Sequence, residues 1–280
     1  MPRPSLLAVR LLALLVLSPG CPTDPAPPSD DDDSVPAGPD CDDLQGAYAP
    51  NPAAPAEPPW GGTIFLSPSI LTDADPTSYA GRTSLGIGTR TTFDRRADAW
   101  VTTEVHLFEA TVAGASVEVR VNTEFDLATA EAHADIYLPA IGRLPALLLS
   151  DLRTVTIHDG LEPFGGGNED LLIHVLQGED YMADGILEET LAHEAAHTSL
   201  DPHYRDAPDW LAAQDADGGY VSTYARDFPD REDLAESVVP YLAYRHRPDA
   251  YTADQLDDVA ASMPNRMLFF DCLGLELAGE

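Results

Sequence analysis

Residues 185–199 read GILEETLAHEAAHTS, and this stretch decides how the rest of the chain is interpreted. Its apolar residues recur at the spacing of one helix face: Ile186, Leu187, Leu191 and Ala192. Glu188 and Glu189 stand near its start, where the helix dipole favours negative charge. The pattern predicts a helix from about residue 185 to Ser199, with one buried face.

Two histidines and a glutamate give this helix its chemistry. His193 and His197 are four residues apart, so they share one face of the helix. Two imidazoles so placed can bind one Zn²⁺, each at about 2.0–2.1 Å. Glu194 is turned by roughly 100° from His193, which puts it beside the metal rather than on it. There it can accept a proton from a metal-bound water. The motif therefore predicts a hydrolytic site with one zinc ion per chain.

A catalytic zinc takes a third protein ligand and keeps one position open. One candidate is His203, ten residues after His193, which is the spacing of the metzincins. Those proteins turn the chain at a Gly between the second and third His, whereas Leu200 stands here, and Leu is poor at positive φ. The other candidate is Glu232, which forms a Glu-x-x-Ala-Glu stretch with Glu236 on a predicted helix.

The residues around Glu232 also carry a family resemblance. Residues 221–237 read VSTYARDFPDREDLAES, and with the His-Glu-x-x-His helix they resemble the gluzincins, in particular the catalytic domain of anthrax lethal factor and its relatives. The resemblance covers about residues 171–237. It implies a zincin-like fold, zinc ligation by Glu232, a His oriented by Glu236 and an oxyanion stabilised by the hydroxyl of Tyr224.

Ligand chemistry and the local turn both favour Glu232 over His203 as the third ligand. His203 is then interpreted as a loop residue. Asp201 lies close enough in sequence to accept a hydrogen bond from a ligand His.

The site predicts hydrolysis of an extended peptide, most simply by an endopeptidase. In zincins an edge strand above the metal adds a substrate strand to the sheet, and residues 171–175 (LLIHV) are interpreted as that strand. The preceding run Gly165–Gly167 is interpreted as a turn or flap. Two alternatives stay open: a zinc amidohydrolase acting on a non-peptide amide, and a surface binding lipoprotein with a structural or vestigial zinc site. Glu194 counts against the structural site, which needs no general base.

Strands precede helices along the chain. Alternating apolar residues predict strands at 101–108, 116–121, 154–158 and 171–175. Helices are predicted at 127–149, with an interruption at Gly142 and Pro145, and at about 185–199, 209–214, 231–243 and 253–263. This order predicts an α+β domain with a helical C-terminal part. The resemblance to the zincins implies that its sheet is mixed and ends in an edge strand.

The charge of the chain limits its partners. The 280 residues contain 48 Asp and Glu against 15 Arg and no Lys, for a formal net charge of −33. Nucleic acid and anionic lipid are excluded as electrostatic partners because both need a clustered basic surface. The negative charge also mildly disfavours acidic substrates. The oligomeric state is not predicted.

The N-terminal part has the composition of an export signal and a tether. Residues 1–20 contain a short apolar run, LLALLVL at 11–17, and predict a signal peptide. The small residues before Cys21 resemble a bacterial lipobox, with Ser18 where Leu is usual, and predict lipidation of Cys21. Residues 21–59 are rich in Pro and Asp and predict a disordered tether, followed by the metallopeptidase domain at 60–280.

These features predict an exported protein held on a bacterial membrane through its lipid, in the periplasm or at the cell surface. In an oxidising compartment the two other cysteines, Cys41 and Cys272, are free to form a disulfide, and the sequence leaves open whether they do.

Overall fold

A computed structural model describes residues 41–277. The expected signal peptide, the lipidation site Cys21 and the first half of the expected tether lie outside this part of the chain. The strands are β1 (Tyr79–Asp94), β2 (Ala99–Val112), β3 (Ala115–Asn122), β4 (Thr154–His158), β5 (Gly165–Gly167) and β6 (Asp170–His174). The α-helices are α1 (Leu44–Ala47), α2 (Leu127–Ile141), α3 (Val175–Asp184), α4 (Leu187–Ser199), α5 (Asp201–Tyr204), α6 (Pro208–Asp217), α7 (Thr223–Asp227), α8 (Asp233–His246), α9 (Ala253–Ser262) and α10 (Pro264–Leu273). The described residues also form two 3₁₀ helices, η1 (Ala146–Leu149) and η2 (Pro248–Ala250).

The six strands form one mixed, open sheet in the order β1-β2-β3-β4-β6-β5. Strands β1, β2 and β3 are antiparallel neighbours, whereas β3, β4 and β6 are parallel. The short strand β5 pairs antiparallel with β6 and is the last strand at that end of the sheet. The α+β class and the mixed sheet predicted from the sequence are thereby confirmed.

Two predictions about the strands are wrong. Residues 171–175 do not form the edge strand, because β6 lies between β4 and β5. The Gly165–Gly167 run is not a turn or flap but the edge strand β5 itself. Glycines carry no side-chain pattern that would indicate a strand. This strand is instead specified by its pairing with β6 and by the helix beneath it.

The sheet and α2 share one core. Val117, Val119 and Val121 are buried at every second position of β3, which is the strand period. From α2, Leu138 and Ile141 are fully buried in the same apolar cluster. Asp126 caps the start of α2, since its side chain accepts a hydrogen bond from the backbone N–H of Thr129. This core holds the sheet at a fixed position for α4 to pack against.

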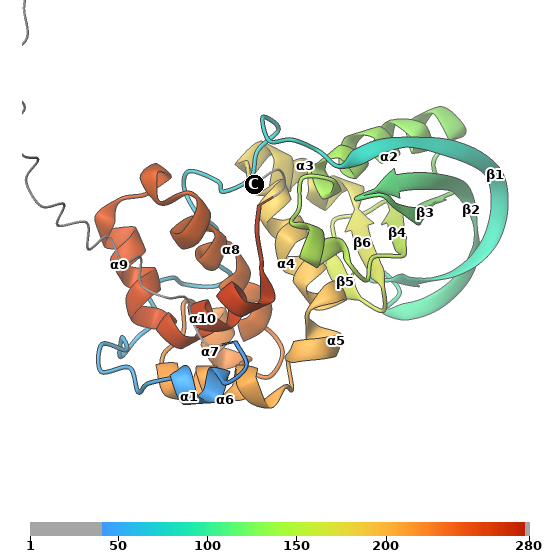
Figure 1. Ribbon diagram of the computed structural model, residues 1–280. Coiled ribbons are helices and arrows are strands. Elements are labelled where there is room, and N and C mark those ends of the chain that lie inside the picture. Colours follow the sequence, from blue (N-terminus) through green and yellow to red (C-terminus); the bar gives the residue numbers. More distant parts are fainter. Residues whose placement is uncertain (1–40, 278–280) are drawn as a thin grey trace, which may run out of the picture. The chain divides into compact units, whose positions relative to one another are not determined.

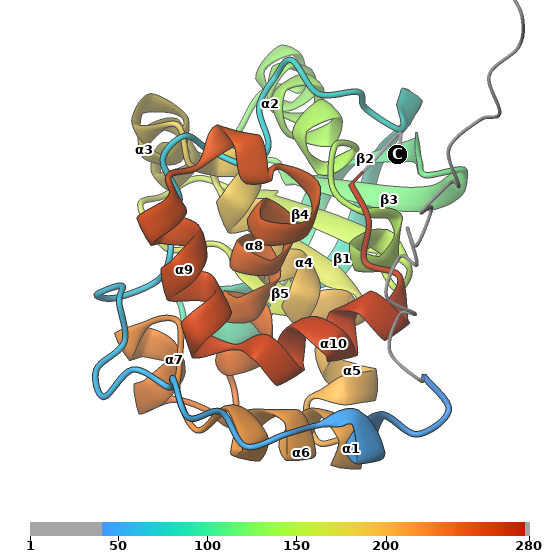
Figure 2. The same ribbon diagram turned by 60° about the vertical axis from the view of Figure 1, so that its left-hand side comes forward.

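Helix α4 lies between the sheet and the C-terminal helices (Figure 1). It packs against β5 and β6 on one side and against α8 on the other. Helices α8, α9 and α10 gather on the side of α4 that is away from the sheet (Figures 1 and 2). A fully buried ion-pair network fixes this helical part, since Arg266 contacts both Asp217 at the end of α6 and Asp233 at the start of α8.

The segment 41–59, assigned to the tether by its composition, lies against the domain. Leu44 is buried, and Asn265 Oδ1 accepts a hydrogen bond from the backbone N–H of Ala49 at 3.0 Å. The domain therefore begins before residue 60, contrary to the expected boundary. Pro and Asp content predicted an extended solvated chain, but it does not reveal anchoring contacts formed with residues more than 200 positions away.

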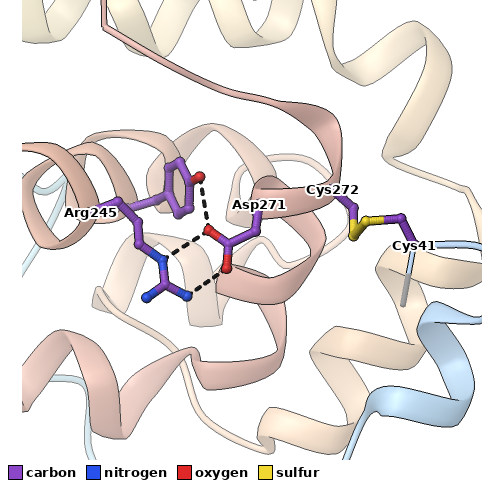
Figure 3. The surroundings of a disulfide bond; sticks show 5 residues. Cys41, Arg245, Asp271 and Cys272 are labelled. Atoms are coloured by element: carbon purple, nitrogen blue, oxygen red, sulfur yellow. Dashed lines mark hydrogen bonds and ion pairs between the residues drawn. A yellow bond between two sulfur atoms is a disulfide. The ribbon is translucent and has the colours of Figure 1, made fainter. Parts of the chain in front are cut away.

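A disulfide between Cys41 and Cys272 fastens this segment to α10 (Figure 3). Beside it, Arg245 of α8 forms a two-pronged ion pair with Asp271 at 2.9 and 2.6 Å. Tyr241 donates its hydroxyl to the same carboxylate at 3.1 Å. Both ends of the described chain are thus joined to the helical part. No helix between residues 41 and 277 is long and apolar enough to cross a membrane.

Candidate metal centre

Helix α4 presents His193, Glu194 and His197 as the sequence predicts. The preceding helix α3 ends at Gly185, whose left-handed backbone (φ 72°) turns the chain into α4. In the first turn of α4, Glu189 accepts hydrogen bonds from the backbone N–H groups of Leu66 and Ile70, at 2.9 and 2.8 Å. These contacts fix the start of the helix and therefore the position of its histidines along the helix axis.

Glu232, just before the first residue of α8, completes a group of three ligand atoms. Its Oε2 lies 3.5 Å from His193 Nε2 and 3.2 Å from His197 Nε2. The two Nε2 atoms are 3.2 Å apart. The three side chains are only 11%, 16% and 6% exposed. Within residues 41–277 no other group of His, Cys, Asp or Glu converges in this way.

These three distances match the edges of a coordination tetrahedron. An ion with bonds of about 2.0–2.1 Å separates its tetrahedral ligand atoms by about 3.3–3.4 Å. The observed separations of 3.2, 3.2 and 3.5 Å bracket that value. A group of two imidazoles and one carboxylate at this spacing fits a single metal ion, with its fourth direction free.

A second carboxylate lies beside each histidine. His197 Nδ1 lies 2.9 Å from Asp201 Oδ2, and His193 Nδ1 lies 3.4 Å from Glu236 Oε1. The other oxygen of Glu236 is held by the hydroxyl of Ser222 at 2.5 Å and by the backbone N–H of Ile64 at 3.1 Å. A carboxylate on Nδ1 leaves Nε2 as the nitrogen that faces a metal. The structure thus brings Asp201 and Glu236 to the places that the sequence analysis gives them.

The field of these carboxylates attracts a cation. Burial alone would lower the pKa of His197, but hydrogen bonds to Asp201 and Glu232 outweigh it and raise the pKa to about 10. Burial alone would raise the pKa of Glu232, yet its contacts with His193 and His197 hold it below the usual range. The acidic surroundings that favour a proton on the imidazole favour a metal ion in its place.

His203 takes no part in this group. It lies on α5, its side chain is 54% exposed, and its Nε2 contacts Asp151 Oδ2 at 2.6 Å. The alternative ligand set with His203 is therefore not the one that the fold assembles. Helix α5 continues almost directly from α4 at Asp201, so the chain makes no sharp turn that would bring His203 back to the two ligand histidines.

A cleft of about 830 Å³ opens over the three ligands. Glu194 and Tyr224 line it, as do three arginines that the sequence analysis does not single out: Arg95, Arg205 and Arg231. Tyr224 comes from α7, whose first turn is capped by the side chain of Ser222. Burial and the charge of Glu232 raise the pKa of Tyr224 to about 12, so its hydroxyl keeps its proton at neutral pH.

Strand β5 forms one wall of the cleft and lies directly on α4. A Cβ atom on Gly166 would be only 1.8 Å from the backbone oxygen of Glu194. Thr198 of α4 also accepts a hydrogen bond from the backbone N–H of Gly167 at 3.0 Å. The glycines therefore allow the edge strand to approach the helix that carries the ligands. Three consecutive glycines are the only sequence signal for this contact.

Comparison with known proteins gives no relative. No family model matches the chain, and neither the curated proteins nor the solved structures include a match to it. The function is therefore argued from the site itself.

Proposed function

We propose that this protein is a zinc-dependent endopeptidase of the gluzincin type. The observation that carries the proposal is the tetrahedral spacing of His193, His197 and Glu232 in a cleft that also contains Glu194. Two nitrogen ligands, one oxygen ligand and a free fourth direction suit Zn²⁺ better than Mg²⁺ or Ca²⁺, which prefer oxygen ligands in larger number.

Glu194 is proposed as the general base. It follows His193 on α4, so it would lie beside a bound metal without binding it, and it is half-buried in the cleft wall. When bound, zinc polarises a substrate carbonyl and lowers the pKa of a coordinated water to about 7. Glu194 accepts a proton from the attacking water and returns it to the leaving amine. A structural zinc site would have no use for a carboxylate in this place.

Tyr224 is proposed to stabilise the oxyanion. Its side chain lines the same cleft, and the raised pKa of its phenol supports a protonated hydroxyl that can donate a hydrogen bond. A donor fixed before the reaction begins is worth most where negative charge develops during the reaction. A proton acceptor, Glu194, and a hydrogen-bond donor, Tyr224, in one cleft suit the addition of water to an amide.

An extended peptide is proposed to bind along β5. As the last strand of the sheet, β5 has one edge without a partner strand in the described residues, and its Gly166 and Gly167 line the cleft. Addition of a substrate strand would satisfy its backbone groups and hold the peptide over the ligands. The antiparallel edge strand on α4, together with Glu232 delivered by α8, also supports a zincin-like architecture.

Export of the chain and lipid attachment at Cys21 are proposed on the same sequence grounds as above. The disulfide between Cys41 and Cys272 supports export, because such bonds persist in oxidising compartments and are rare in the cytosol.

The test combines metal analysis with peptide cleavage. The full chain, incubated with zinc and freed of excess metal, is expected to retain one zinc per chain by elemental analysis. Glu232→Ala is expected to lose it, whereas His203→Ala serves as a matched control and keeps it. Glu194→Gln is expected to keep the zinc and lose cleavage of a peptide library. A folded wild-type chain that binds no zinc, or a Glu194→Gln variant that cleaves normally, would refute the proposal.

A further inference from the structure

The charged side chains of the cleft balance one another, although the protein as a whole is very acidic. The cleft lining contains three arginines, Arg95, Arg205 and Arg231, against three carboxylates, Glu194, Asp201 and Glu232. These groups balance, so the two charges of a bound zinc ion would leave the cleft positive, while the chain as a whole carries −33. With zinc bound, a ligand would therefore meet a local field opposite to that of the surrounding surface.

Arg95 differs from the other arginines of the described chain because its side chain has no hydrogen-bond or ion-pair partner. Its guanidinium forms no hydrogen bond and no ion pair with any residue between 41 and 277. Arg231 pairs with Glu232 Oε1 at 3.0 Å, and Arg205 pairs with Asp206 at 3.2 Å. Carboxylates outnumber arginines about threefold in this sequence, so an arginine left unpaired beside the cleft is not explained by a shortage of acidic partners.

The turn between β1 and β2 holds Arg95 in this position. Its neighbour Arg96 anchors the turn by ion pairs with Asp94 and Glu124, each at 2.8 Å. Arg95 instead lies against the edge strand: a Cβ atom on Gly165 would be 2.8 Å from its Nη2. The free guanidinium is therefore next to the first residue of β5, where a bound peptide would pass.

Arg95 also lines a second cavity of about 230 Å³, together with β5 and the aromatic rings of Phe93 and Trp100. The acidic residue in that lining is Asp170, which is engaged by the hydroxyls of Thr154 and Thr156. Trp100 is 57% exposed. An apolar wall beside a free guanidinium suits a side chain that ends in a carboxylate and reaches it through methylene groups.

We propose that Arg95 binds a carboxylate of the substrate beside the free edge of β5, so that the enzyme prefers acidic peptides. The proposal rests on the proposed peptidase function. Guanidinium and carboxylate are matched in shape and charge and can form two parallel hydrogen bonds. The general repulsion of acidic peptides by a chain of charge −33 would be overcome at this one place. The carboxylate belongs either to an Asp or Glu side chain or to the C-terminus of the peptide.

The experiment uses the zinc-loaded full chain with Glu194→Gln, which is expected to bind peptides without cleaving them. The probes are pools of ten-residue peptides with Asp or Asn fixed at one scanned position and neutral residues elsewhere, each made with a free and with an amidated C-terminus. Retention on the immobilised chain is measured by mass spectrometry. At one position the Asp pool, or the free-carboxylate pools as a group, should be retained about tenfold better than the matched neutral pool.

Arg95→Gln should abolish that preference. The matched control is Arg226→Gln, which removes the same charge from an exposed residue that does not line the cleft. If Arg95→Gln loses neither preference, or if the chain with Arg95 shows no preference for either kind of carboxylate, the proposal is overturned. Loss of the preference for Asp but not for the free C-terminus, or the reverse, identifies the source of the carboxylate.

Cleavage by the wild-type chain separates this proposal from the proposed function. Equal cleavage of Asp and Asn pools, with free and amidated ends alike, refutes the role of Arg95 and leaves the peptidase function intact. Retention of acidic pools through Arg95 without any cleavage by the zinc-loaded wild type refutes the peptidase function and leaves a carboxylate-binding cleft.

Discussion

Replacement of Gly166 by Ala tests how closely the edge strand must lie on the ligand helix. The added Cβ would be 1.8 Å from the backbone oxygen of Glu194 and 2.6 Å from its carbonyl carbon. Real Cβ atoms stay at least 3.0 Å from such neighbours, so β5 and α4 must separate by at least 1.2 Å. Neither clashing atom belongs to a flexible side chain that could rotate away.

The separation has two expected costs. Overpacking of this kind lowers the free energy of unfolding by about 1–3 kcal/mol. A misplacement of about 1 Å at a substrate-binding strand lowers kcat/KM by about 100-fold. Zinc content should stay at one per chain, because the proposed ligands are two side chains of α4 and that of Glu232, just before α8, rather than groups of β5.

The assay compares Gly166→Ala with Gly61→Ala, a control in which the new Cβ has no neighbour within 4 Å. Urea unfolding, zinc content and cleavage of the peptide pools are measured for both. Gly61→Ala is expected to behave as wild type. If Gly166→Ala keeps wild-type stability and wild-type cleavage, the contact between β5 and α4 does not constrain the site and the reasoning fails.

Three further changes have defined outcomes. Asp201→Asn weakens the hold on His197 and should lower zinc affinity about 10- to 100-fold in a chelator competition, and an unchanged affinity would contradict this role. Cys272→Ser opens the disulfide and should lower the free energy of unfolding by about 2–5 kcal/mol in urea without reductant, an effect that should vanish when wild type is measured reduced. Burial raises the pKa of Asp170 from 3.8 to about 6 despite hydrogen bonds from two threonines. The native state then holds this proton more tightly than the unfolded state, so stability falls as the pH rises from about 4 to 6. Asp170→Asn should reduce that fall in urea titrations, and an identical pH dependence in both chains would count against it.

Much of the candidate centre could be predicted because helix geometry links sequence spacing directly to position in space. A single helix is enough to place His193 and His197 on one face. The positions of Glu232 and Glu236 could be predicted from a second helix. The choice against His203 followed from Leu200, which leaves no easy turn. In the structure Leu200 has a right-handed helical backbone and is the only residue between α4 and α5.

The strands that border the cleft could not be predicted in this way. Most residues of β1 are exposed or half-buried, so its sequence has little apolar alternation, and pairing with β2 along its whole length defines it. β5 consists of three glycines and depends on contacts with α4 and β6. Arg95 likewise could not be identified from the sequence. Its proposed role depends on its unpaired guanidinium and on its position beside β5, which lies 70 residues further along the chain.

Cys41 and Cys272 are 231 positions apart in the sequence. The bond between them closes the intervening chain into a covalent ring. A single backbone cut anywhere inside this ring leaves one molecule, because the two new chain ends remain connected through sulfur. The three proposed metal ligands all lie within it, so one nick cannot separate the histidines of α4 from Glu232. A chain nicked once would migrate as two pieces only after reduction.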